Sequence, residues 1–210
     1  MNKKIILGIA AHPDDLEFSC GGSLAKWKEE DCQIYYAAFS PCKKSIPEGF
    51  DSNILYRELQ NSCTALGIKE EQVFTYNIPV RDFPEHRQAI LETLIDLRKK
   101  LNPDLVLIPN SSDVHQDHHQ IHLEGVRAFR KISMLGYELI WNNSGAMLNY
   151  HVPLALRHLD KKVEMINNYE TQKGRPYANV DFIKSWARMR GILCNSKFAE
   201  SFELINWKDD

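Results

Sequence analysis

The sequence predicts an α/β protein with a single-domain, Rossmann-like sheet that is mostly parallel and flanked by helices. Short β-rich runs alternate with amphipathic helical stretches through the first two thirds of the chain, which is the pattern of repeated βαβ units. No Pro-, Gly- or Ser-rich linker divides the 210 residues. We therefore expect one domain over residues 1–210.

The expected helices and strands of the parallel part follow from the spacing of apolar residues. The clearest helix carries Ile90, Leu94, Leu97 and Leu101 on one face. An earlier helix is expected to end at Gly67, a residue typical of C-terminal caps. The expected strands are 4–10, 33–39, 72–78 and 104–109, and the helices between them are 21–30, 52–66 and 85–101.

The rest of the chain is expected to contain shorter elements. A helix begins near His118 and runs to about Lys131. The least regular stretch, 40–51, is expected to be a loop that lines the site. The later elements are expected to be strands 138–141 and 148–152, helices 155–171 and 179–193, and a final strand at 201–206.

Composition excludes several classes of protein. The five cysteines are odd in number and form no Cys-x-x-Cys pair, so they indicate reduced thiols in a cytoplasmic protein. The apolar run near the N-terminus is at the short limit for a signal peptide, and no run is long enough for a membrane span. The net charge is only -2 and the basic residues are scattered, so nucleic acid is not an expected partner.

Two segments rich in histidine and carboxylate follow expected strands. His-Pro-Asp-Asp at 12–15 comes directly after strand 4–10, and His-Gln-Asp-His at 115–118 follows strand 104–109. In an open parallel sheet, ligands bind outside the carboxyl ends of the strands, so these segments should converge. One imidazole and one carboxylate from the first, with one imidazole from the second, would make an open catalytic zinc site with a fourth position for water.

Each segment has a simpler explanation when it is taken alone. His-Pro-Asp-Asp is compatible with a capped turn, and His-x-x-His is compatible with solvated histidines at a helix start. The presence of both after hydrophobic strands favours a metal site. His118 and His122 form a competing ligand pair at helical spacing, and Asp117 is placed to hydrogen-bond an imidazole and fix its tautomer.

With these motifs, the chain resembles the PIG-L/LmbE family of zinc-dependent deacetylases, which act mainly on N-acetylglucosamine-type amides. The resemblance rests on residues 11–17 (Ala-His-Pro-Asp-Asp-Leu-Glu), the glycines at 21–22, and 115–118. It extends more loosely to Arg57, to 161–172 and to 198–203, and so covers essentially the whole chain.

The resemblance implies a metal site drawn from both motifs, with His12, Asp15 and His118 as ligands. It disfavours His122 as a ligand. Zinc is the expected metal, and two imidazoles with one carboxylate also suit ferrous iron.

The resemblance also implies the chemistry: a hydrolase that removes the acetyl group from an amino sugar or its conjugate, with metal-held water as the nucleophile. Asp14 is then the general base, and His115 is the electrophilic or acid partner at the carbonyl, tuned by Asp117. Arg57 is an expected substrate contact.

Three alternatives stay open from the sequence. An amidase for another acyl amino-sugar conjugate would use the same residues, and a metal-binding protein without turnover would keep the ligands alone. A nucleotide-binding protein is disfavoured because no Gly-x-Gly-x-x-Gly follows the first strand. The expected partner is a small amino-sugar substrate, and a homo-oligomer is compatible with the sequence.

Overall fold

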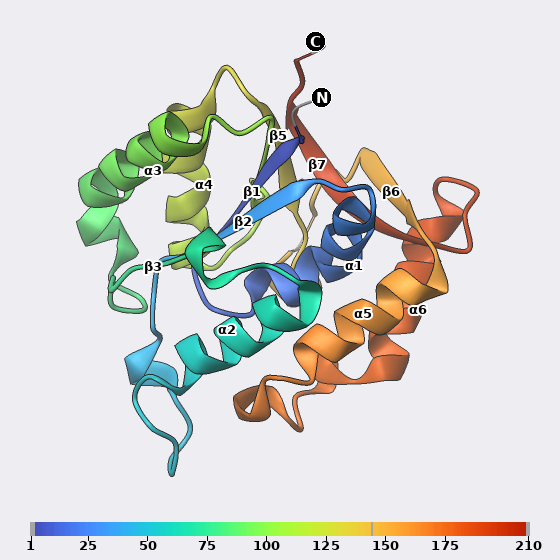
Figure 1. Ribbon diagram of the computed structural model, residues 1–210, viewed down its shortest axis with the longest axis horizontal. Coiled ribbons are helices and arrows are strands. Elements are labelled where there is room, and N and C mark those ends of the chain that lie inside the picture. The colour runs from blue at the N-terminus through green and yellow to red at the C-terminus, as the bar shows by residue number, and fades with distance from the viewer. Residues whose placement is uncertain (1–2, 144, 209–210) are drawn as a thin grey trace.

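The computed structural model describes residues 3–143 and 145–208, which form one seven-stranded sheet with helices on both faces (Figure 1). The strands are β1 Ile5–Ala10, β2 Gln33–Ala38, β3 Val73–Thr75, β4 Leu105–Pro109, β5 Ser133–Tyr137, β6 Tyr150–Leu154 and β7 Phe198–Asn206. The α-helices are α1 Asp15–Glu29, α2 Ile54–Leu66, α3 Arg87–Leu101, α4 Gln116–Phe129, α5 Leu156–Ile166 and α6 Val180–Ile192. Short 3-10 turns are η1 Lys43–Ser45, η2 Glu70–Gln72, η3 Phe83–His86, η4 Ile140–Asn142, η5 Glu170–Gln172 and η6 Pro176–Ala178.

The strand order is β3-β2-β1-β4-β5-β7-β6, and the first five strands in this order pair in parallel. β7 runs antiparallel to both of its neighbours. The expected mostly parallel, Rossmann-like sheet is thus confirmed. The chain builds outward from β1 to β2 and β3 on one side, and from β4 to β5 on the other. The topological switch point, where ligands bind in such sheets, therefore lies between β1 and β4.

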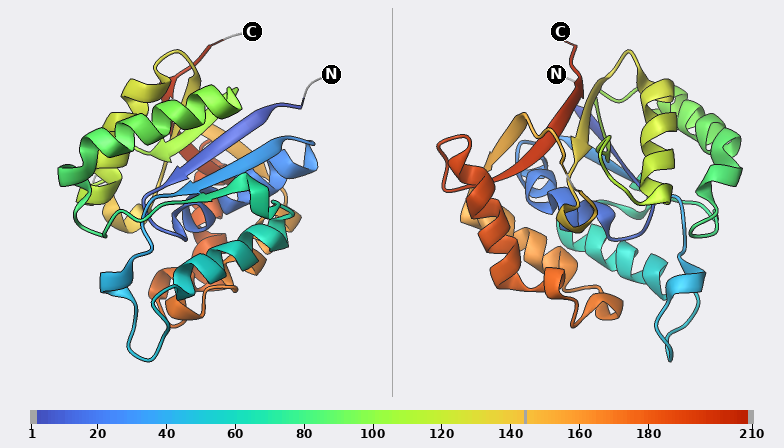
Figure 2. Two further views of the ribbon diagram at one scale, coloured as in Figure 1. Left: turned by 60° about the vertical axis from the view of Figure 1, so that its left-hand side comes forward. Right: turned by 180° about the vertical axis from the view of Figure 1, so that it is seen from behind.

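Two apolar cores hold the helices against the sheet. α3 and α4 cover one face, while α1, α2, α5 and α6 cover the other (Figure 2). Because side chains alternate along a strand, β1 contributes Ile6 to one core and Leu7 to the other. The predicted stripe on α3 is confirmed, since Ile90, Leu94 and the two leucines that follow it are buried. Within the described parts of the chain, no helix has the length and apolar character to cross a membrane.

Several expected boundaries were wrong, mostly in the last third. The strand expected at 138–141 is instead the turn η4, and the strand lies just before it as β5. Gly136 and Ser133 weakened the apolar signal of that run, yet the glycine is needed there: an added Cβ would lie 2.9 Å from the Cα of Asn110. The helix expected over 155–171 ends at Ile166, where the chain turns toward η5.

Smaller differences affect three other elements. The strand expected over 72–78 is reduced to β3, and the final strand is longer than expected because it begins at Phe198. The helix expected over 85–101 begins with the turn η3 and becomes α3 at Arg87.

Helix α1 begins six residues before the expected position and bends at Cys20, where the backbone is not helical. After the bend, the N–H groups of Gly22 and Ser23 donate to the carboxylate of Glu200 at 3.1 and 2.6 Å. The expected helix at 21–30 thus corresponds to the half of α1 beyond the bend. A Cβ on Gly22 would lie 2.7 Å from a methyl group of Leu154 and 3.1 Å from Glu200, so a larger residue would have to displace these side chains.

Glu200 also forms a buried ion pair with Lys162, whose Nζ lies 2.7 Å from its Oε1. Glu200→Gln should lower the free energy of unfolding by about 3 kcal/mol, because it leaves the lysine charge buried without its partner. Urea denaturation measures this. The control is Glu30→Gln, which affects only a more exposed pair with Lys26 at 3.9 Å and should change stability by less than about 0.5 kcal/mol. Equal effects of the two substitutions would contradict a structural role for the buried pair.

Candidate active site

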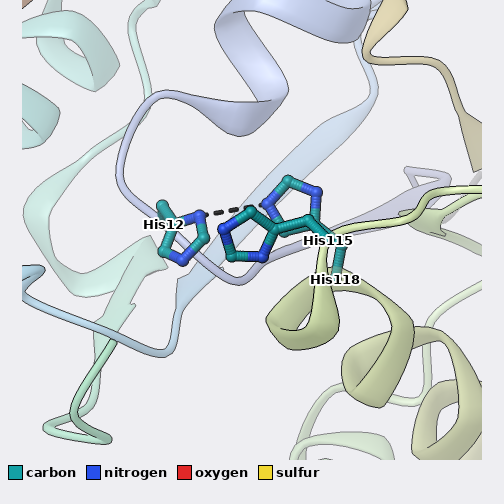
Figure 3. Close-up of side chains that lie close together, drawn as sticks. All are labelled: His12, His115 and His118. Atoms are coloured by element: carbon teal, nitrogen blue, oxygen red, sulfur yellow. Dashed lines mark hydrogen bonds between the residues drawn. The ribbon is translucent and has the colours of Figure 1, made fainter. Parts of the chain in front are cut away.

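Two loops meet at the carboxyl ends of β1 and β4. β1 pairs in parallel with β4, with Gly8 opposite Leu107, so the segments that leave both strands emerge side by side at the switch point. The first loop carries His12 and the second leads to His115 and His118 at the start of α4. The three imidazoles lie together in Figure 3, where the dashed line joins His12 and His118. The predicted convergence of the two motifs is confirmed.

Three potential ligand atoms face one another in this cluster. Nδ1 of His12 lies 3.0 Å from Nε2 of His118, and Oδ1 of Asp15 lies 3.7 and 3.4 Å from these two nitrogens. Ligands held about 2.0–2.1 Å from a tetrahedral zinc ion are separated by about 3.3 Å. The spacing of the three atoms therefore fits a single small divalent cation.

The hydrogen bonds of the outer ring nitrogens support the same fit. Nε2 of His12 lies 3.0 Å from Oδ2 of Asp117, and Nδ1 of His118 lies 2.8 Å from Oδ2 of Asp113. A carboxylate can only accept, so each outer nitrogen carries a proton. A ring that binds a metal must give up any proton on its inner nitrogen, and the two inner nitrogens are then both acceptors that face each other beside a carboxylate. A cation between them relieves this repulsion.

The electrostatic potential between these side chains is negative. Burial by itself would lower the pKa of His118, but Asp15 and Asp113 outweigh it and raise the pKa to about 10. Burial would likewise raise the pKa of Asp15, yet His118 and His12 hold it well below its usual value. The second oxygen of Asp15 accepts the backbone N–H of His12 at 2.8 Å, which fixes the carboxylate in place.

Asp14 precedes α1 but makes no side-chain capping bond within the described structure, which counts against the capped-turn explanation of this motif. It lines the same cavity as His12 and His118. Burial raises the pKa of Asp14 well above its usual value, and the negative charge of Asp15 adds to this effect. Asp14 is therefore a stronger proton acceptor than an ordinary aspartate.

His115 has a different environment from the other two histidines. It is the N-cap of α4, and its Nδ1 accepts the backbone N–H of Asp117 at 3.2 Å. Burial, followed by the positive charges of His118 and His12, lowers the pKa of His115 to about 4. The ring is thus neutral at pH 7, and its proton is on Nε2.

The three histidines could also bind a metal as a set, because one ring nitrogen from each lies within 4.8 Å of the others. Coordination by Nε2 of His115 would require a proton on Nδ1, directly opposite the N–H of Asp117. Two donors would then face each other. The capping bond therefore favours Asp15 over His115 as the third ligand.

Two aspartates, Asp117 and Asp113, contact the outer ring nitrogens of His12 and His118. The side chain of Asp117 contacts His12, whereas only its backbone N–H contacts His115. A second donor to this carboxylate is the N–H of Arg81, 2.8 Å away, from a residue in the left-handed region with φ 74°. Sequence reasoning missed Asp113; its position two residues before His115, after a buried strand, was the available signal.

The cavity beside these groups has a volume of about 230 Å³. One wall is aromatic: Trp141 stacks on Tyr177 with ring centroids 4.1 Å apart, and Phe18 meets both rings edge-on. Polar groups of the lining include Asn142, Gln172 and Arg175, and the loop 40–51 contributes Cys42 and Ser45 as expected.

Two residues considered from the sequence lie elsewhere. Arg57 is exposed and pairs with Asp51 at 3.6 Å, and Arg175 is the arginine that lines the cavity among the described residues. The ring of His122 is turned to the carbonyl of Pro109, 2.8 Å from Nδ1, so His118 and His122 do not face a common point. A larger groove of about 560 Å³ lies near the amino end of β4, far from the two motifs. Its lining includes several lysine and arginine side chains and Asp104.

Comparison with known proteins identifies the family of the chain. The family described as PIG-L, GlcNAc-PI de-N-acetylase, matches residues 7–129, which is more than half of the chain and includes both motifs. The chain therefore belongs to the PIG-L family. An uncharacterized deacetylase of Escherichia coli K12, YaiS, is 33% identical over 145 residues, which span 65% of this chain and 74% of that protein.

Solved structures share the fold. The N,N'-diacetylchitobiose deacetylase from Pyrococcus horikoshii has a TM-score of 0.81 at 18% identity, over 97% of this chain and 84% of that one. The 4-carboxy-2-hydroxymuconate hydratase GalB from Pseudomonas putida KT2440 has a TM-score of 0.78 at 16% identity, over 99% and 98%. At these identities the likeness shows the fold alone, and this fold includes an enzyme named for another reaction.

A metal-binding test compares the roles of His118 and of its exposed neighbour His119. The wild-type protein should take up about one zinc ion and gain thermal stability with it, by roughly 4 kcal/mol at a thousand times the dissociation constant. His118→Ala should remove most of both effects, since it deletes one of three ligand atoms. His119→Ala, at an exposed position, is the matched control and should change neither. Metal content after desalting and the midpoint of thermal unfolding are the measurements, and equal zinc retention by both variants would refute this ligand assignment.

Proposed function

We propose that this protein is a metal-dependent hydrolase that removes the acetyl group from the N-acetyl amide of an amino sugar or its conjugate. The observation that carries the proposal is the convergence of Nδ1 of His12, Oδ1 of Asp15 and Nε2 of His118, 3.0–3.7 Å apart, beside Asp14 in one cavity. Membership of the PIG-L family supports the reaction. The names of the chitobiose deacetylase and of YaiS point to the same chemistry.

His12, Asp15 and His118 would hold the metal, which we propose to be zinc, with ferrous iron as the alternative for the same donors. Such an ion polarises a carbonyl and lowers the pKa of water from about 15.7 to about 7, so that hydroxide is available at neutral pH. With three protein ligands, room remains for water and substrate.

Asp14 is the proposed general base. Its raised pKa brings it closer to neutrality, where a base combines availability with a strong tendency to take up a proton. Asp14 would accept the proton of the attacking water as the new bond to the acetyl carbon forms. Once protonated, it is one candidate to deliver that proton to the departing amine.

His115 is the proposed electrophilic partner. Its pKa of about 4 keeps it neutral, and the capping bond from the N–H of Asp117 leaves the remaining ring proton on Nε2 as a donor. Such a donor can stabilise the negative charge that develops on the carbonyl oxygen. His115 is also the second candidate to protonate the amine.

The walls of the cavity suit a sugar. Aromatic rings such as Trp141 and Tyr177 offer apolar surface, while Gln172, Asn142 and Arg175 offer hydrogen-bonding groups for hydroxyls or an acidic substituent. This combination of apolar walls and a few polar groups is usual for small-molecule sites. A cytoplasmic location is part of the proposal, supported by five free cysteines.

Asp14→Asn should lower the rate of acetate release by at least about 100-fold while zinc remains bound, because it removes a proton acceptor and no ligand. The assay measures acetate against other released acids over N-acetylglucosamine glycosides, conjugates and nucleotide sugars. Asp82→Asn changes a partly exposed aspartate paired with Lys44, and this control should retain full activity.

Full turnover by zinc-loaded Asp14→Asn would exclude Asp14 as the base. Release of a different acid by the wild type would instead favour the related amidase. Zinc binding without release of any acid across the panel would favour a metal-binding protein without turnover, and hydration of an unsaturated acid would favour a reaction of the GalB type.

His115→Asn should lower kcat by about 100-fold or more and leave zinc content unchanged. Asparagine can still cap α4 through its side-chain oxygen, so the helix start is preserved while the ring N–H is lost. Loss of zinc from this variant would show instead that His115 is a ligand.

A further inference from the structure

Asp113 lies at the centre of the loop that leads from β4 to α4, and no catalytic or binding role has been assigned to it so far. Its side chain is buried, with a residue exposure of 3%. Both of its oxygens are used: Oδ2 lies 2.8 Å from Nδ1 of His118, and Oδ1 accepts the backbone N–H of His115 at 2.9 Å. One carboxylate thus contacts both histidines of the second motif.

The surrounding loop holds this carboxylate firmly. The backbone of Asp113 forms a β-bridge with Asn143 and donates to the carbonyl of Asn110 at 3.3 Å. The side chain of Asn110 in turn donates to Asn143 and to the carbonyl of Tyr137 at the end of β5. Asp113 is therefore anchored to β5 and to the loop after it, independently of the histidines.

We propose that Asp113 is a positioning residue that keeps the proton of His118 on Nδ1 and so directs the lone pair of Nε2 toward the metal. The proposal rests on the metal site of the proposed function. Neutral imidazole has one proton, and the nitrogen that keeps it is set by the hydrogen bond at the other side of the ring. A buried carboxylate at 2.8 Å holds it on Nδ1, and it also makes the ring more basic as a ligand.

Asp117 contacts the outer ring nitrogen of His12, so each of the two imidazoles is hydrogen-bonded to its own carboxylate. Its Oδ2 lies 3.0 Å from Nε2 of His12, so this ring is directed toward the metal through Nδ1 instead. The two aspartates approach from opposite sides and leave the inner nitrogens 3.0 Å apart. Within the described structure Oδ1 of Asp117 is buried without a partner, whereas both oxygens of Asp113 are satisfied.

Asp113→Asn is a sharp test because the amide cannot replace both acceptors. If its oxygen faces the N–H of His115, its NH₂ group faces Nδ1 of His118 and moves the ring proton to Nε2, where the metal should bind. If the amide is reversed, its oxygen still accepts from Nδ1 of His118, but more weakly than a carboxylate does, and two donors meet at His115. Either orientation weakens the metal site, and the change of volume is negligible.

The experiment compares zinc affinity by chelator competition in the wild type, Asp113→Asn and Asp104→Asn. Asp104 is the matched control: its carboxylate also accepts a backbone N–H, from Ile5 at 2.7 Å, but at the amino end of β4. Asp113→Asn should raise the zinc dissociation constant by about 10- to 100-fold. Asp104→Asn should leave the zinc dissociation constant unchanged.

A second measurement needs no variant. Long-range ¹⁵N–¹H correlation spectra of the zinc-loaded wild type should show the proton of His118 on Nδ1. Weakened zinc binding in Asp113→Asn together with this tautomer supports the proposal. Wild-type affinity in Asp113→Asn, or a His118 Nδ1 without a proton, overturns it and leaves the proposed function intact. A wild-type protein that binds no zinc or iron would refute the proposed function itself.

Discussion

The parallel pairing of β1 with β4 is the constraint on which the site depends. His12 and His118 are 106 residues apart, and only the adjacency of these two strands brings their ring nitrogens to 3.0 Å. At a switch point the adjoining loops turn to opposite faces of the sheet, which leaves a crevice between them. α1 and α4 cover opposite faces, so each helix start delivers its polar residues to this crevice from its own side.

Buried carboxylates connect this crevice to the rest of the chain. Glu17, one turn after Asp14, accepts hydroxyl hydrogen bonds from Tyr36, Ser62 and Tyr169, at 2.7–2.9 Å. Burial raises the pKa of Glu17, while these donors oppose the shift. Glu58 on α2 holds both the N–H and the hydroxyl of Thr171, which fixes the turn η5 beside the cavity. Helix α1, which begins at Asp15, and the turn η5 are thus both tied to α2.

The sequence was sufficient for the parallel sheet and for the meeting of the two motifs, because both follow from local patterns and from the geometry of strand ends. The spacing of Ile90 and Leu94 predicts the buried face of α3 directly from the sequence. The choice between Asp15 and His115 as the third metal ligand cannot be made in this way, because it depends on the backbone N–H that donates to His115. The cavity wall was beyond prediction for a related reason. Trp141 and Tyr177 lie on separate 3-10 turns, one after β5 and one before α6, and their stacking depends on how the fold brings those turns together. Arg57 illustrates the limit, since a helical position alone does not tell whether a side chain reaches the cavity or the solvent.

The candidate site is divided between two parts of the chain. Residues 7–129, which match the family, contain the proposed ligands and Asp14, Asp113 and His115. Much of the cavity wall comes from later turns, through Trp141 and Tyr177. Changes in those later turns can alter what enters the cavity without disturbing the acceptors that would hold a cation. In this chain the proposed metal ligands depend on β1 and β4, whereas the shape of the cavity depends on turns at its rim.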